Sequence, residues 1–96
     1  MLVLSEIKQI LTYIKPELQS RFNVKRIGLF GSVVRGEQTS NSDIDIIVDF
    51  NKPIGIEFID LATFLESNLK THVDLVSMNG VKAKYLQTFE AEIIYV

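Results

Sequence analysis

The sequence has no cysteine and only one histidine, His72. The absence of cysteine excludes disulfides and thiolate chemistry, and one histidine is too few for a zinc site or for a histidine-based nucleophile relay. The carboxylates of aspartate and glutamate are therefore the side chains from which we expect catalysis or metal binding.

Long apolar runs and an excess of positive charge are also missing. The apolar runs are only a few residues long, and Glu6 and Lys8 interrupt the N-terminal segment too early for a signal peptide. We therefore expect a cytoplasmic protein with no membrane partner. Ten basic residues against twelve acidic ones give a net charge of −2, which argues against direct binding of nucleic acid through its phosphates.

The length and composition are those of an ordinary globular domain. The chain has 96 residues, of which 47% are apolar and 23% are charged, and it contains no repeat or linker-like tract. This length suffices for one hydrophobic core and is too short for two. We therefore expect a single domain over residues 1–96.

Helical spacing of the apolar residues predicts four helices, over residues 4–14, 15–22, 51–68 and 81–90. Proline cannot continue the hydrogen-bonded ladder of a helix but suits its first turn. Pro16 therefore predicts that the first two helices are separate and meet at an angle.

Short apolar or alternating segments predict four strands, over residues 26–30, 43–50, 72–77 and 93–96. In the second strand the alternation places Ile44, Ile46, Val48 and Phe50 on one face, and we expect this face to be core. The succession of helices and strands indicates an α/β or α+β fold with a small mixed sheet of about four strands covered by helices. The order of the strands cannot be read from the sequence.

Two aspartates on the same face of the second strand predict a metal site. Asp43 and Asp45 are two residues apart, so both point to one side of the strand. Two like charges about 4 Å apart repel by about 4 kcal/mol at an effective dielectric near 20, which a cation or a proton must offset. With Asp74 on another strand they can hold one or two divalent cations, and Mg²⁺ suits such oxygen ligands best.

A Gly-Ser turn ends the first predicted strand and suggests a binding site for phosphate. Gly31 and Ser32 supply backbone N–H groups and a hydroxyl, and Arg35 adds a guanidinium near the same edge of the sheet. Ten residues separate Ser32 from the Asp43–Asp45 pair. This spacing places a phosphate-binding turn and a metal pair on neighbouring strands.

This arrangement resembles the nucleotidyltransferase superfamily that includes DNA polymerase β. It is most similar to the smallest members, the minimal nucleotidyltransferase (MNT) antitoxins. The motif lies in residues 29–50, LFGSVVRGEQTSNSDIDIIVDF, while residues 73–76 and 90–95 resemble the strand with the third acid and the C-terminal segment of the family. The resemblance thus covers nearly the whole chain.

The resemblance implies a polymerase β-like fold and a role for each residue of the motif. The implied catalytic residues and Mg²⁺ ligands are Asp43, Asp45 and Asp74, and the implied nucleotide-binding residues are Gly31, Ser32 and Arg35. Asp74 would complete the metal site and help to deprotonate the attacking hydroxyl. Arg35 would neutralise phosphate charge or fix the loop.

The resemblance also implies a partner and a reaction. Family members of this size neutralise a toxin with a HEPN (higher eukaryote and prokaryote nucleotide-binding) domain, which is an RNase, and we expect a hetero-oligomer with such a toxin. The implied reaction transfers AMP from ATP to a tyrosine hydroxyl of the toxin and releases pyrophosphate.

Two other functions stay open at this point. The protein could neutralise a toxin by binding and masking it, without catalysis. It could instead be a nucleotidyltransferase that acts on a small molecule or an RNA end. Lys82 and Lys84 form a short basic cluster, and solvated surface charge explains it better than a contact with phosphate or with acids of a partner.

Overall fold

The computed structural model describes residues 2–96. Its helices are α1 (Leu4–Phe22), α2 (Ser32–Arg35), α3 (Glu57–Leu69) and α4 (Ala83–Phe89), and α4 is followed by the 3-10 turn η1 (Glu90–Glu92). Its strands are β1 (Val24–Phe30), β2 (Ile44–Phe50), β3 (Val73–Ser77) and β4 (Ile94–Tyr95). Among these residues no helix is both long enough and apolar enough to cross a membrane.

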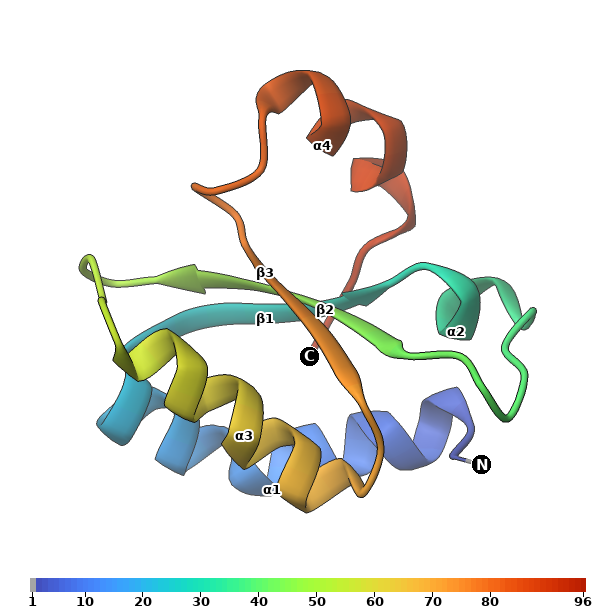
Figure 1. Ribbon diagram of the computed structural model, residues 1–96, viewed down its shortest axis with the longest axis horizontal. Helices are drawn as coiled ribbons and strands as arrows, with labels where there is room; N and C mark the ends of the chain where they lie inside the picture. Colours follow the sequence, from blue (N-terminus) through green and yellow to red (C-terminus); the bar gives the residue numbers. More distant parts are fainter. Residues whose placement is uncertain (1) are drawn as a thin grey trace.

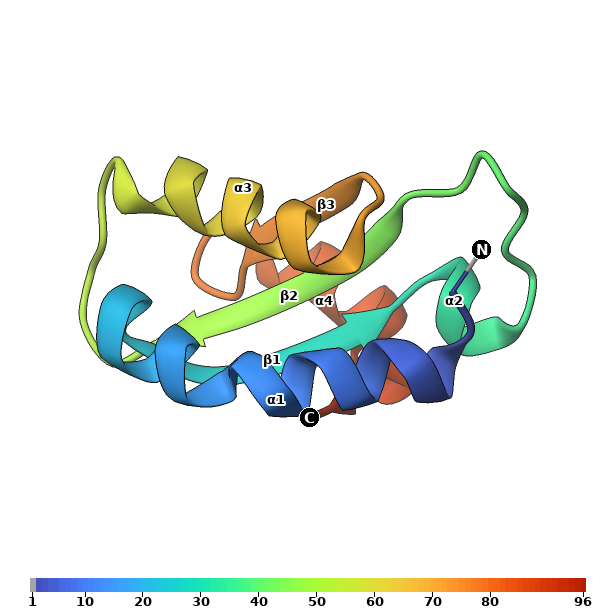
Figure 2. The same ribbon diagram turned by 90° about the horizontal axis from the view of Figure 1, so that it is seen from below.

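The strands form one mixed sheet in the order β3-β2-β1-β4. Strand β1 is antiparallel to β2 and to β4, whereas β2 and β3 are parallel. Helices α1 and α3 lie along one face of the sheet, and α4 stands on the other side (Figure 1). Figure 2 shows the first of these faces from below, with α1 and α3 in front of the strands. The fold predicted from the sequence is confirmed.

The core lies between the sheet and helices α1 and α3. The strand residues that it buries are apolar and almost fully excluded from solvent: Ile27, Leu29, Ile44, Ile46 and Val48. The helices contribute matching apolar stripes, such as Ile7, Leu11 and Leu18 from α1 and Leu61 and Leu65 from α3. The alternation predicted for β2 is confirmed for Ile44, Ile46 and Val48, and Phe50 packs against the same core while partly buried. Ile47 departs from it, because it lies on the other face and is fully buried as well.

The prediction of two N-terminal helices is wrong, because Pro16 lies inside the single helix α1. An internal proline costs about 3 kcal/mol through its missing N–H and its steric clash. Leu18 and Phe22, which follow it, are both buried in the core, and burying a side chain of this size stabilises by about 2 kcal/mol. Packing beyond the proline therefore offsets the cost and keeps one helix.

The predicted start of the next helix near Asn51 is also wrong, because α3 begins at Glu57. Asn51 donates its backbone N–H to the carbonyl of Asn23 at 2.9 Å, which holds the chain against the edge of α1 and β1 instead. The N–H of Gly55 donates to the carboxylate of Glu57 at 2.9 Å and closes the turn before α3. The remaining predicted boundaries lie within two residues of the observed ones.

Candidate active site

The predicted site residues come from three strands that meet at one end of the sheet. Because β1 runs antiparallel to β2, the end of β1 lies beside the start of β2, and Phe30 pairs with Asp45. Because β3 runs parallel to β2, its start lies at the same end, and Asp45 pairs with Asp74. The strand order therefore places Gly31, Asp45 and Asp74 together although 42 residues separate Gly31 from Asp74 in the sequence.

Gly31 forms the sharp turn between β1 and α2. Its backbone has φ 76° and ψ −151°, a conformation that is essentially restricted to glycine. A Cβ at this position would overlap the carboxylate of Asp45, with Oδ2 as the nearest atom. Two separate features therefore require glycine at this position: the backbone conformation and the close contact with the Asp45 carboxylate.

Asp45 and Asp74 lie side by side on the face of the sheet that α1 and α3 leave free. Burial raises the pKa of Asp45 to about 6, and the neighbouring negative charges of Asp74 and Asp43 add to this rise. Arg35 acts in the opposite direction but more weakly. A carboxylate that is partly desolvated beside two others is well placed to gain from a cation.

Asp43 is exposed and lies just before β2, at the end of the loop over residues 37–43. A short turn supports this loop, in which the N–H of Thr39 donates to the hydroxyl of Ser42 at 2.9 Å and the N–H of Ser42 donates to the carbonyl of Thr39 at 3.0 Å. Asp43 is near enough to raise the pKa of Asp45, but the three aspartates do not form a closed cluster. Within residues 2–96 no group of three or more His, Cys, Asp or Glu side chains is arranged to hold a metal ion.

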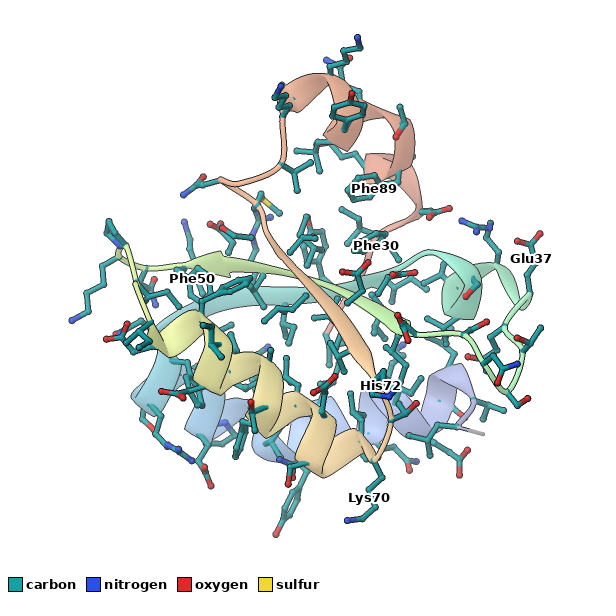
Figure 3. The ribbon with its side chains drawn as sticks, in the orientation of Figure 1. Phe30, Glu37, Phe50, Lys70, His72 and Phe89 are labelled. Carbon is teal, nitrogen blue, oxygen red and sulfur yellow. The ribbon has the colours of Figure 1, made fainter. Side chains whose placement is uncertain are left out.

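Ser32 and Arg35 are the first and last residues of α2, beside the aspartates. Ser32 is partly exposed, and its carbonyl accepts a hydrogen bond from the N–H of Glu37 at 2.9 Å. The guanidinium of Arg35 pairs with Glu37 at 2.7 Å and with Glu92 at 3.1 Å, and these hydrogen bonds raise the pKa of Arg35. Figure 3 shows Glu37 on the loop that follows α2.

Glu92 joins the site although its sequence pattern predicts no role for it. Its Oε1 accepts the N–H of Gly31 at 2.9 Å, so the backbone donor expected for phosphate already has a carboxylate partner. This hydrogen bond, helped by Arg35, lowers the pKa of Glu92. The pairing of β4 with β1 helps to bring Glu92 to the site, and the sequence does not reveal that pairing.

Comparison with known proteins assigns this geometry to a family. The model of the nucleotidyltransferase domain matches residues 11–96. The chain belongs to the nucleotidyltransferase domain family. The resemblance seen in the sequence is thereby confirmed, and so is the prediction that the protein is a nucleotidyltransferase.

Individual relatives place the chain more closely within this family. It is 47% identical to the protein adenylyltransferase MntA of Thermococcus cleftensis, over all of this chain and 98% of the relative. A structure of a tri-AMPylated HEPN toxin from Shewanella oneidensis in complex with an MNT antitoxin matches with 26% identity and a TM-score of 0.67, over 93% of this chain and 70% of that one. A toxin-antitoxin structure with AMP-PNP matches with 33% identity and a TM-score of 0.63, over 86% and 63% of the two chains.

The donor set suits a divalent metal such as Mg²⁺. Asp45 and Asp74 offer hard carboxylate oxygens from paired strand positions. Burial raises the pKa of Asp45 first, and neighbouring negative charge adds to the rise; a cation would neutralise that charge. Asp43 lies outside the strand pair, and in the described part of the chain no three such side chains are arranged to hold a metal by themselves, so oxygens of a bound nucleotide would have to complete such a site. This is the usual pattern for Mg²⁺, which is commonly held by one or two carboxylates together with substrate phosphates.

Proposed function

We propose that the protein is an antitoxin that transfers AMP from Mg-ATP to a tyrosine hydroxyl of a cognate HEPN-domain RNase toxin and so neutralises it. The observation that carries this proposal is the pairing of Asp45 with Asp74 directly beside the Gly31 turn. The names of the relatives support it, since one is a protein adenylyltransferase and another is an antitoxin bound to an AMPylated HEPN toxin. ATP as the donor agrees with the neighbour that holds AMP-PNP.

In the proposed reaction the acceptor oxygen attacks the α-phosphorus of ATP. A bond forms between that oxygen and the α-phosphorus, the bond from the α-phosphorus to the oxygen that bridges to the β-phosphate breaks, and pyrophosphate leaves with that electron pair. Asp74 receives the proton of the hydroxyl. Bound Mg²⁺ would neutralise phosphate charge and align the attacking and leaving oxygens.

The protein contributes mainly position and charge to this reaction. Asp43, Asp45 and Asp74 would hold the metal, and Ser32 and Arg35 would bind the phosphates of the nucleotide. Gly31 carries no side chain, so its backbone can lie close to the Asp45 carboxylate at the end of the sheet. Phosphoryl-type transfer depends mostly on such positioning and electrostatic stabilisation, so these groups suffice without a covalent intermediate.

The exposure of the site suits a protein acceptor. Asp43 and Asp74 are both exposed, so a side chain presented by another protein can reach them without rearrangement of the fold. The acceptor therefore belongs to the partner of a complex between this chain and the toxin. We place this reaction in the cytoplasm, where Mg-ATP is available.

Intact-mass spectrometry tests the proposal. The protein is incubated with Mg-ATP and a cognate HEPN-domain toxin, and the toxin is expected to gain the mass of one or more adenylate groups on tyrosine. EDTA should prevent the gain, while the complex still forms. A stable complex whose toxin carries no adenylate under any of these conditions contradicts the proposal.

A further inference from the structure

The C-terminal segment contacts the end of β1 at two neighbouring points. The rings of Phe30 and Phe89 stack with their centroids 4.5 Å apart, as the side by side placement of these labelled residues in Figure 3 shows. One residue further along the chain from Phe30, the N–H of Gly31 donates to Glu92 Oε1 at 2.9 Å. The segment from α4 to η1 is thus joined to the turn on which the proposed nucleotide site depends.

The pairing register explains why a side chain serves as acceptor at this point. Gly28 pairs with Tyr95 and Leu29 with Ile94, so continuing the antiparallel register would place Gly31 opposite Glu92. Strand β4 begins only at Ile94, and Glu92 lies before it in the 3-10 turn η1 rather than in an extended strand. The carboxylate of Glu92 therefore supplies the acceptor that the backbone of β4 no longer provides.

Glu92 also fixes the guanidinium of Arg35. Nη1 of Arg35 lies 3.1 Å from Oε1 and 3.2 Å from Oε2 of Glu92, while Nε donates to Glu37 at 2.7 Å. The side chain of Glu92 is only 25% exposed, compared with 63% for Glu37. The partly buried carboxylate of Glu92 thus holds both the Gly31 turn and the Arg35 guanidinium. Charge-assisted hydrogen bonds of this kind are stronger than neutral ones.

We propose that Glu92 is a positioning residue for the nucleotide, which holds the Gly31 turn and the Arg35 guanidinium in the geometry that binds the triphosphate. The inference rests on the proposed function for its nucleotide but is independent of which acceptor receives the AMP. As a carboxylate, Glu92 would repel the phosphates rather than bind them, so its role is indirect. It acts through Gly31 and Arg35, which lie on either side of Ser32.

Binding of Mg-AMP-PNP, measured by calorimetry without any toxin, tests this role. Glu92→Ala removes the partner of Gly31 and of Arg35, and its Kd is expected to rise about tenfold, in line with the loss of charge-assisted hydrogen bonds. Glu92→Gln keeps an oxygen acceptor for Gly31 but loses the ion pair, so its Kd should rise less. Glu90→Ala is the matched control, because Glu90 is an exposed residue of the same turn, and its Kd should equal that of the wild type.

Two further readouts separate positioning from a general effect on the fold. The melting temperature of Glu92→Gln should match that of Glu90→Gln, although the two variants differ in Kd. In the transfer assay Glu92→Gln should raise the KM for ATP and leave kcat at saturating ATP nearly unchanged. If Glu92→Ala folds poorly, the Kd values of Glu92→Gln and Glu90→Gln are sufficient to test the inference.

Three results would overturn the inference. The first is an unchanged Kd for Glu92→Gln. The second is a lower Kd for Glu92→Gln, which would mean that the carboxylate competes with phosphate for Gly31. The third is a Kd that rises equally in Glu92→Gln and in the Glu90→Gln control. Failure of the proposed function would give a different result. The wild type would then bind Mg-AMP-PNP and substitution of Glu92 would weaken this binding, but no toxin would be modified.

Discussion

The two faces of the central sheet differ in chemistry although the same strands form both. On the face covered by α1 and α3, Ile44, Ile46 and Val48 of β2 are buried among apolar side chains. On the opposite face the same strand carries Asp45 beside Asp74, and burial raises the pKa of Asp45 to about 6. The first face is therefore apolar and packed, while the second, although it also buries Ile47, keeps like charges in a place where the fold alone gains nothing from them.

Adjacent residues of β2 show this difference directly. Ile46 is fully buried, whereas Asp45 next to it points to the other side and is only partly buried. If the first face serves stability and the second serves chemistry, substitutions at these neighbours should separate the two properties. The following predictions test this separation, in order of decreasing effect.

The largest effect is expected for the double variant Asp43→Asn with Asp45→Asn. It removes the negative charges that would hold the metal, so AMP transfer should fall by at least about a thousandfold. The fold should persist, because the change relieves repulsion between like charges. Intact mass of the toxin measures the transfer, and the melting temperature measures the fold.

The same variant separates catalysis from masking of the toxin. If AMP transfer neutralises the toxin, cells that express both proteins should lose protection when the double variant replaces the wild type, even though the complex still forms. Full protection by a variant that transfers no AMP would show instead that binding alone neutralises the toxin.

Ile46→Ala should have the opposite outcome. Truncating a fully buried isoleucine leaves a cavity in the core, and we expect a loss of about 3 kcal/mol in the free energy of unfolding. The fraction that remains folded should transfer AMP at a rate within about twofold of the wild type, because Ile46 faces away from Asp45. Urea unfolding and transfer rates per folded molecule provide the measurements. A large loss of transfer per folded molecule would contradict the separation of the faces.

Two glycines with positive φ allow a finer comparison. Gly31→Ala should cost about 3 kcal/mol of stability and abolish most transfer, because its backbone conformation excludes alanine and the new methyl group meets the Asp45 carboxylate. Gly36→Ala is the matched control, since Gly36 has φ 71° but no neighbouring atom lies within 4 Å of the place that its new methyl group would take. That variant should lose about 1 kcal/mol and keep its activity. Equal losses of transfer in the two variants would show that the contact with Asp45 does not explain the need for Gly31.

How far the sequence predicts the molecule also differs between the two faces. The apolar face follows from periodicity, since the alternation of β2 and the stripes of the helices require only local spacing. The wrong predictions for this face concern where helices begin and end. The predicted break at Pro16 is absent, because packing of Leu18 and Phe22 outweighs the local cost of proline.

The charged face depends on contacts between distant segments. The motif predicted Gly31, Ser32 and the aspartates, and the structure brings Gly31, Asp45 and Asp74 together. The role of Glu92 could not be predicted in the same way, because it depends on the short strand β4 pairing with β1. Nothing in the spacing between residues 31 and 92 indicates that their pairing brings a carboxylate to the turn.

The smallest effect is expected for the stability of the metal-free protein as a function of pH. The pKa of Asp45 is raised from 3.8 to about 6 in the folded state, so between these values the unfolded chain releases its proton more readily than the folded one. Stability is therefore fully retained below about pH 4, falls as the pH rises toward 6 and stays low above it. Because Asp45 is partly exposed, solvent screening reduces the expected loss to about 1 kcal/mol.

Asp45→Asn should abolish this loss of stability. In EDTA this variant should therefore melt at a higher temperature than the wild type at pH 8 and at a similar temperature at pH 4. Asp60→Asn, an exposed substitution on α3, controls for the removal of one negative charge. Adding Mg²⁺ at pH 8 should then raise the melting temperature of the wild type more than that of Asp45→Asn, and an equal rise in both would mean that Asp45 does not hold the metal.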